Sequence, residues 1–366
     1  MRWGLADVRR AKLKFGLLVG AVSLLVFLVL FLSTLSSALV QSFIGTLQRA
    51  DADVVVYSAT ARDNLQASRL TPAVTDAVRR VPGVAEAAGV GSLPFSAKLP
   101  GGKTEEMLLF GVAADGPGRP TGLTAGRLAT SPGEVAVDAA GLKLGDRVTL
   151  PASGTELTVV GLLRGARFAA ADTGYVAPAT YEGIVRGTNP NLPFVPRNFI
   201  AVRTVPGADP GQVANAIGAQ VLGTKGYTRE DAIAAVPGVG QVRETFNILV
   251  AITFGIAVVV IGFFFLILTV QRLKVFTLLR AVGASPRCLA RGVIGQVTLV
   301  VALASVLAVA LTALAVRGAN TGIPVELSPW LVGGTILATE VAAVLAGLVS
   351  VSRIRRLDPA AATGAR

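Results

Sequence analysis

The residue types that carry most catalytic chemistry are scarce in this sequence. It contains no histidine and a single cysteine, Cys288. Histidine is the commonest general base and metal ligand, and the His-Glu-x-x-His motif of zinc proteases cannot exist without it. One thiol cannot form an internal disulfide. We therefore expect no catalytic residue and no metal site in this chain, and we exclude a membrane protease of the zinc type.

One stretch comes close to a nucleotide-binding motif. A P-loop needs Gly-x-x-x-x-Gly-Lys-Ser/Thr between a strand and a helix, so that backbone N–H groups can cradle a phosphate. Gly102-Lys103-Thr104 matches the end of this pattern, but the required first glycine falls on Ala97. Residues 100–106 are better explained as a hairpin turn. If ATP is used, we expect another chain to bind it.

Glu340 is the only charged residue inside any of the long apolar runs. A carboxylate at the centre of a membrane costs roughly 2.5–3.5 kcal/mol on insertion scales, so it should face protein and not lipid. One interpretation is a helix–helix contact or a switch in a dimer. The alternative is a protonated carboxyl that is hydrogen bonded to a nearby hydroxyl such as Ser305 or Thr312.

The positive charge of the chain is concentrated in three short segments. Residues 1–14, 271–292 and 353–366 hold 14 of the 34 basic residues but only two of the 22 acids, which leaves 20 bases and 20 acids elsewhere. The net charge of +12 therefore flanks apolar runs, as expected for cytoplasmic loops and tails of a membrane protein. Nucleic-acid binding would need the charge on one folded face, and we exclude it.

Four apolar runs predict four transmembrane helices, at residues 15–40, 248–270, 293–316 and 329–352. The first run has 26 uncharged residues, which exceeds the ~7–15 of a secretory signal, so we expect it to stay attached. It should continue outward through Leu47 as a stalk. The remaining ranges are an interfacial helix at 1–14, a cytoplasmic hairpin at 271–292, an outer loop at 317–328 and a cytoplasmic tail at 353–366.

Residues 41–247 are expected to form the stalks and one extracytoplasmic domain of the α+β class, inserted between the first two membrane helices. Its β-branched runs and turn signals predict a mixture of strands and helices. The predicted strands are 53–57, 107–112, 134–138, 147–150, 157–163 and 198–204. The predicted helices are 70–80 and 209–221, and the three prolines of residues 189–198 predict a loop.

The segment between the second and third membrane helices is longer than a connector needs. Helix–helix connections usually take about 2–8 residues, whereas residues 271–292 are more than twice that. Gly283 can adopt the left-handed conformation that ends a helix. Ser285 is a good N-cap, and Pro286 fits the first position of the next helix. We expect a rigid basic turn that contacts a partner, formed by Leu279, Arg280, Ala281, Val282, Gly283, Ala284, Ser285, Pro286 and Arg287.

The sequence LLRAVGAS at residues 278–285 resembles the cytoplasmic signature of the FtsX-like permease family, which includes the MacB, LolC/LolE and DevC types. The extracytoplasmic part is similar to the MacB-type periplasmic core domain. The phrases that carry this likeness are VPGV (81–84), FGV (110–112), GR (126–127), EVAVD (134–138), LGDRV (144–148) and TVVG (158–161), and RRLDPA (355–360) resembles the ending of the family. The family often has an acidic residue and a glycine shortly before the LLRA segment, where this chain has Val275-Phe276-Thr277.

The resemblance implies a permease subunit of an ABC system in the cell membrane, with both termini in the cytoplasm. It implies an ABC ATPase subunit as partner, which binds ATP and Mg²⁺, while this chain carries no cofactor. It also implies a second copy of the chain or a close paralogue, and movement of the outer domain for export or extraction of an amphipathic substrate. An extracytoplasmic accessory protein or hydrolase is a further candidate partner.

All of these sequence features are equally compatible with a second function. The chain could be a mechanotransmitter that regulates an extracytoplasmic cell-wall enzyme and transports nothing. A sensor kinase, the third class, shares the arrangement of helix, outer domain and helix, but nothing resembling a kinase follows residue 270. Binding of an extracellular hydrolase to the outer domain would favour the mechanotransmitter.

The charge distribution generates a test of topology. After replacement of Cys288, single cysteines at Lys14, Gln271 and Arg355 should be shielded from an impermeant thiol reagent in intact cells. A cysteine at Asn189 should react under the same conditions. Labelling of the Gln271 position from outside would contradict the predicted orientation.

Overall fold

The computed structural model describes residues 12–271, 275, 278, 282, 285–318 and 329–354. The chain divides into two compact units. The helical unit comprises Met1–Ser37, Glu244–Asn320 and Val325–Arg366, and the α/β unit comprises Ala38–Arg243 and Thr321–Pro324. The interfacial helix predicted at 1–14, the outer loop at 317–328 and the tail at 353–366 lie mostly outside the described residues.

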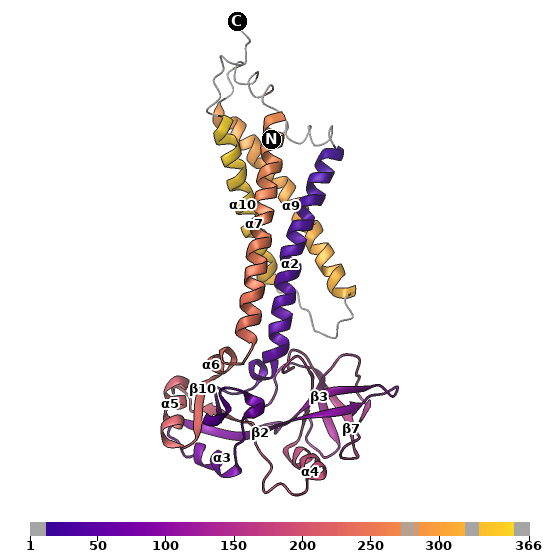
Figure 1. The fold of residues 1–366 in the computed structure, drawn as a ribbon, viewed down its shortest axis with the longest axis vertical. Helices are drawn as coiled ribbons and strands as arrows, with labels where there is room; N and C mark the ends of the chain where they lie inside the picture. The colour runs from indigo at the N-terminus through magenta and orange to yellow at the C-terminus, as the bar shows by residue number, and fades with distance from the viewer. Residues whose placement is uncertain are drawn as a thin grey trace. The chain divides into compact units, whose positions relative to one another are not determined.

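Four long helices account for the apolar runs (Figure 1). They are α2 (Lys12–Arg49), α7 (Val239–Gln271), α9 (Pro286–Gly318) and α10 (Pro329–Ile354). All four are long and apolar enough to cross a membrane, which confirms the four predicted spans. Helices α9 and α10 begin at a proline, as predicted for Pro286, because the fixed φ and missing N–H of proline suit the first helical position.

The α/β unit contains one mixed sheet of ten strands. The strands are β1 (Val54–Ser58), β2 (Val84–Lys98), β3 (Thr104–Gly111), β4 (Leu123–Gly126), β5 (Glu134–Asp138), β6 (Arg147–Leu150), β7 (Thr155–Leu163), β8 (Asp172–Val176), β9 (Phe199–Thr204) and β10 (Thr224–Thr228). Four short α-helices complete the unit, namely α3 (Pro72–Val78), α4 (Pro178–Thr188), α5 (Pro210–Gln220) and α6 (Arg229–Ala234). The strand order is β10-β1-β9-β2-β3-β8-β5-β7-β4, with β6 paired to β2 and β7.

Strand β2 belongs to both halves of this sheet. Its residues Val84 to Val90 pair with β9, and its residues Gly91 to Lys98 pair with β3. Figure 1 shows β2 crossing from the part of the unit that carries α3, α5 and α6 toward the part that carries β3 and β7. We call β10, β1 and β9 the first half of the sheet. The second half consists of β3, β4, β5, β6, β7 and β8.

Alternation along the strands sends buried side chains to two faces. On one face, Val55 of β1, Phe199 of β9, Phe110 of β3 and Tyr175 of β8 belong to a single cluster, which we call the shared core. It therefore draws on both halves of the sheet.

The other face has two separate cores. Val54 and Ile200 of the first half pack with Val78 of α3 and Ile217 of α5. The second half forms its own cluster, in which strand residues such as Leu109 pack with Tyr181 of α4. No residue belongs to both clusters.

The sequence predicted the strands rich in β-branched residues well. Strands β5 and β6 have the predicted bounds, and the predicted turn at 100–106 is confirmed by a hydrogen bond from the Leu99 N–H to the Lys103 carbonyl of 2.8 Å. Helix α3 is shorter than the predicted 70–80, because Leu70 instead forms a bridge with Arg197. The loop predicted at 189–198 is also confirmed.

The prediction was wrong where strands lack β-branched alternation. It missed β2, β4, β8, β10, α4 and α6. Strand β2 reads VAEAAGVGSLPFSAK, with two glycines and Pro94, and such residues weaken a strand when judged locally. Pairing with neighbours on both sides overrides that local preference.

Candidate functional site

The predicted coupling turn lies between α7 and α9. Val282 ends a helical turn, since its N–H donates to the Leu278 carbonyl at 3.1 Å, and Ser285 immediately precedes α9. Arg287 lies in the first turn of α9. The other predicted residues, Leu279, Arg280, Ala281, Gly283 and Ala284, lie outside the described residues.

Three apolar side chains around this turn face outward. Val275, Leu278 and Val282 are 53%, 68% and 88% exposed. Their spacing of three and four residues places them on one side of a helix. The three side chains therefore form an apolar stripe beside the predicted coupling turn.

Glu340 lies in α10 with its Oε1 atom buried and without a hydrogen-bond partner. Neither hydroxyl named as a candidate partner is seen to bond to this atom. Ser305 Oγ also has no partner, and the Thr312 hydroxyl donates to the Ala308 carbonyl four residues earlier at 2.8 Å. Serine and threonine on helices commonly bond their own backbone in this way.

The C-terminal end of α2 is built into the α/β unit. As predicted, the helix continues past the apolar run, to Arg49. Val40, Ile44 and Leu47 are buried members of the shared core. Burial of three such side chains is worth about 1.5–3 kcal/mol each relative to leaving them exposed. We call this attachment the α2 joint.

A loop from the second half holds α2 by its backbone. We call residues 164–171, which connect β7 to β8, the latch loop. The Thr46 N–H donates to the Arg167 carbonyl at 2.9 Å, and the N–H groups of Ala169 and Ala170 donate to the carbonyls of Phe43 and Ser42 at 3.2 and 3.0 Å. Three backbone hydrogen bonds therefore fix the position of the loop along the helix axis.

Side chains reinforce the same contact. The Thr46 hydroxyl donates to the Ala166 carbonyl at 2.9 Å, and the buried Tyr175 hydroxyl donates to the same carbonyl at 2.5 Å. Both hydroxyls lie 2.9 Å apart. Burial raises the pKa of the Tyr175 hydroxyl far above its ordinary value, so it stays protonated and acts as a donor.

Gly45 allows this close approach. A Cβ atom at this position would lie 2.6 Å from the Gly165 carbonyl oxygen and 2.7 Å from the Arg167 carbonyl oxygen. Contacts that short do not occur in proteins, so any side chain would push the loop from the helix. Glycine costs a helix about 1 kcal/mol relative to alanine, and here the close contact offsets that cost.

Two buried carboxylates, those of Asp138 and Asp172, hold the latch loop in place. Arg167 is 5% exposed and lies between two carboxylates, with Nη2 2.8 Å from Asp172 Oδ1 and Nε 3.4 Å from Asp138 Oδ1. Asp138 also accepts the Ala166 N–H at 2.6 Å. Burial raises the pKa of Asp172 above its ordinary value although Arg167 opposes this. Removing one member of such a buried group costs about 3–5 kcal/mol.

Two residues of the loop are strained. Ala169 and Ala170 have φ angles of 51° and 60°, in the left-handed region that alanine seldom adopts. Each such residue costs of order 1–3 kcal/mol. Their N–H groups are the two that donate to α2, so the strain is tied to the joint.

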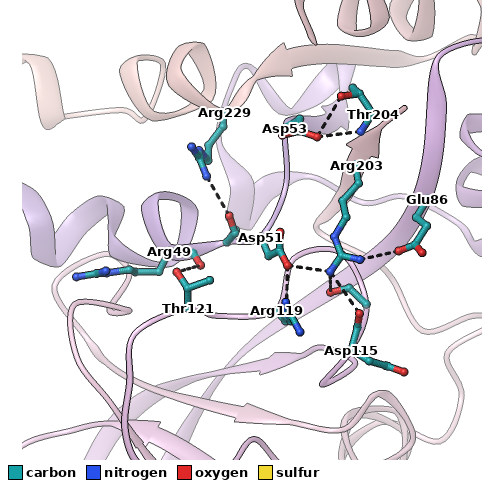
Figure 2. A network of polar contacts seen from close by, with 12 residues as sticks. Arg49, Asp51, Asp53, Glu86, Asp115, Arg119, Thr121, Arg203, Thr204 and Arg229 are labelled. Atoms are coloured by element: carbon teal, nitrogen blue, oxygen red, sulfur yellow. Dashed lines mark hydrogen bonds and ion pairs between the residues drawn. The ribbon is translucent and has the colours of Figure 1, made fainter. Parts of the chain in front are cut away.

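A second cluster holds the residues that follow α2 (Figure 2). The carboxylate of Asp51 accepts hydrogen bonds from Arg119 and Arg203, each at 2.8 Å, and Arg203 also contacts Glu86 of β2 at 2.8 Å. Partial burial raises the pKa of Asp51, but the hydrogen bonds from Arg203 and Arg119 outweigh it, and the pKa lies below its usual value.

Backbone hydrogen bonds fix the same exit segment. The Thr121 N–H donates to the Arg49 carbonyl at 2.7 Å, and Asp51 exchanges bonds with Arg119 and Gly118 at 3.0 and 2.9 Å. Asp53 accepts the Thr204 N–H at 2.9 Å, as Figure 2 also shows. The chain therefore leaves α2 in one fixed direction.

The α2 joint was not predicted from the sequence. Gly45-Thr46 directly after an apolar run was the available signal, since a glycine in a helix often marks close approach of another segment. Nothing local indicates that residues 164–171 would supply that segment. Among the described residues, no group of three or more Asp, Glu, Cys or His could hold a metal ion.

Two family models match the chain. The MacB-like periplasmic core domain matches residues 15–220, and the FtsX-like permease C-terminal matches residues 247–359. The first match alone covers more than half of the chain. Both fall on the regions whose motifs carried the resemblance described from the sequence.

Known proteins similar to the chain include two from Mycobacterium tuberculosis, strains CDC 1551 / Oshkosh and ATCC 25618 / H37Rv. Both are described as uncharacterized ABC transporter permeases, and each is 27% identical over 296 residues, covering 77% of this chain and 76% of the relative.

Two solved structures are also similar. The periplasmic region of MacB from Actinobacillus actinomycetemcomitans has a TM-score of 0.37 at 11% identity, covering 50% of this chain and 92% of that one. The extracellular domain of the noncanonic ABC-type transporter YknZ from Gram-positive bacteria has a TM-score of 0.34 at 14% identity, covering 48% and 99%.

The close contact at Gly45 generates a stability prediction. Gly45→Ala should lower the free energy of unfolding of the α/β unit by about 1–3 kcal/mol, because the methyl group overpacks the joint. Gly183→Ala in α4 is the matched control, since a Cβ there meets nothing within 4 Å, and it should be neutral or stabilising by up to ~1 kcal/mol.

Thermal unfolding followed by tyrosine near-UV circular dichroism measures the stability of the α/β unit selectively. All four tyrosines of the chain lie in the α/β unit, whereas the two tryptophans, Trp3 and Trp330, do not. Equal thermal midpoints for the two variants would contradict the assigned role of Gly45.

The buried carboxyl of α10 generates a second prediction. Glu340→Gln should express and support function better than Glu340→Lys, because the amide keeps the shape without an ionisation cost while lysine adds a charge within the span. Membrane expression level and ATPase rate of the complex are the measurements. If the parent and both variants behave alike, the position is inert.

Proposed function

Since the chain belongs to the FtsX-like ABC transporter permeases that carry a MacB-like periplasmic core domain, we propose that it couples ATP hydrolysis by a separate ATPase subunit to movement of that domain. The work done is export or extraction of an amphipathic substrate. The chain is a multi-pass membrane protein, and its α/β unit is the extracytoplasmic domain.

The observation that carries the proposal is the continuity of α7. Its first residue, Val239, is 3% exposed and belongs to the shared core of the α/β unit. The same helix runs without a break for 33 residues to Gln271, where the coupling segment begins. An α-helix rises about 1.5 Å per residue, so a single helix of ~50 Å connects the coupling segment to a residue of the domain core.

Helix α2 supports the same conclusion. It is a single helix of 38 residues whose last turns are hydrogen bonded to the latch loop. A sliding contact would dissipate a displacement, whereas backbone bonds at Ser42, Phe43 and Thr46 transmit it.

The assembly that follows contains two permease chains, identical or closely related, and two ATPase subunits that bind ATP and Mg²⁺. Both termini and the turn from Leu279 to Arg287 face the cytoplasm in this arrangement. The exposed residues Val275, Leu278 and Val282 would then meet the ATPase with an apolar stripe, and Arg280 and Arg287 would flank it with positive charge.

A negative charge placed on this stripe should weaken binding of the ATPase. We expect Val282→Glu to reduce association with the co-expressed ATPase about tenfold, equivalent to ~1.4 kcal/mol, because a carboxylate cannot be buried in an apolar contact without cost. Val205→Glu is the matched control, an exposed valine in the α/β unit. Arg280→Glu should act in the same direction and Arg317→Glu, at the other end of α9, should not.

Co-purification of the ATPase and its hydrolysis rate per complex are the measurements. Wild-type association in both Val282→Glu and Arg280→Glu would overturn the assignment of the turn to the ATPase contact. Binding of an extracytoplasmic hydrolase to the α/β unit, without transport in reconstituted vesicles, would point to the mechanotransmitter function instead.

A further inference from the structure

The face of the sheet opposite α2 contains a seam between its two halves. On that face, the core beneath α3 and α5 is one cluster, and the core beneath α4 is a separate one. They meet at Gly89-Val90-Gly91 of β2, the point where this strand changes partner from β9 to β3. We call this boundary the seam.

Side chains from both halves pack closely against the two glycines of the seam. The Tyr181 ring of α4 occupies the position of a side chain at Gly91, whose Cβ would lie 2.2 Å from it. Arg197, which precedes β9, occupies the position at Gly89, whose Cβ would lie 2.7 Å from it. Arg197 is also ion-paired with Glu182 of α4, so this pair joins the two halves across the seam.

Two buried polar atoms at the seam lack hydrogen-bond partners in the described part of the structure. Arg197 Nη1 and Thr75 Oγ1 are buried without hydrogen-bond partners. Burial raises the pKa of Tyr181 to about 12, while the charges of Arg197 and Arg69 oppose the shift, so two cations lie near its hydroxyl. Polar groups that lack partners would gain water if the seam opened, which favours opening.

The other face has the opposite character. Its single shared core contains Val40, Ile44 and Leu47 of α2 together with strand residues of both halves. The end of α2 is thus a wedge between the halves on one side of β2, and the seam lies on the other side.

We propose that the two halves of the extracytoplasmic domain hinge about β2 at Gly89–Gly91, with α2 as the wedge that sets the angle. If α2 moves out from between the halves, or if its buried side chains become smaller, the halves approach on the α2 face. This motion separates α3 from α4 on the opposite face. The Arg197–Glu182 pair resists that separation. The hinge is a property of the α/β unit and does not depend on what drives α2.

Distances between spin labels on α3 and α4 test the hinge in the full-length chain. The labels are placed at the exposed positions Ala73→Cys and Arg186→Cys after Cys288→Ser, and labelled chains are diluted with unlabelled ones to remove distances between copies. We expect Leu47→Ala, which thins the wedge, to lengthen the mean distance. Leu157→Ala is its control, because Leu157 is equally buried but belongs only to the second-half core.

Removal of the ion pair tests the seam itself. Glu182→Gln should also lengthen the distance and should speed hydrogen exchange of the Arg197 amide, which donates to the Leu70 carbonyl, roughly two- to fivefold. Glu86→Gln is the control, since the Glu86–Arg203 pair lies between β2 and β9 and does not cross the seam.

Lengthening by Leu47→Ala and Glu182→Gln, with both controls at the parent distance, supports the hinge. An unchanged distance in Leu47→Ala, or equal lengthening in Leu157→Ala, overturns it. If Leu47→Ala loses its tyrosine circular dichroism, Ile44→Val deletes one methyl group from the same wedge and is read in its place. The ATPase association at Val282 is measured separately, so failure of the hinge leaves the proposed function standing.

Discussion

The structure depends on burial of the end of α2 in a core that both halves of the sheet share. Val40, Ile44 and Leu47 contribute about 1.5–3 kcal/mol each by leaving water. That energy is available only when the first half, the second half and the helix are together. The C-terminal end of α2 is thereby part of the folding core of the α/β unit.

Directional interactions convert this non-directional attraction into a fixed joint. Apolar contacts alone would let the helix slide or turn, because the hydrophobic effect scales with area and has little preference for register. The backbone bonds from the latch loop to Ser42, Phe43 and Thr46 select one register. Their cost is visible in the left-handed alanines and in the desolvated Arg167, and buried carboxylates on both sides of that arginine compensate its charge.

The same sheet is continuous in hydrogen bonding yet divided in packing. Strand β2 passes through both halves, so the backbone ladder is unbroken, while on the face opposite α2 the side chains form separate clusters. A strand with two glycines at the division carries no side chain that would tie the clusters together. One face therefore has a single core common to both halves, and the other has a polar, incompletely bonded seam.

The sequence by itself determined the membrane spans, the class of the domain and the start of α9, because these depend on local composition. An apolar run of sufficient length needs no partner to be recognised, β-branched residues between turn signals gave β5 and β6, and Gly283 with Pro286 indicated a turn and a helix start. Only the tertiary structure decided β2, the latch loop and the role of Gly45. Those features depend on contacts between residues more than a hundred positions apart, such as Thr46 with Ala166, and no local pattern records which distant segment will fill the space that a glycine leaves.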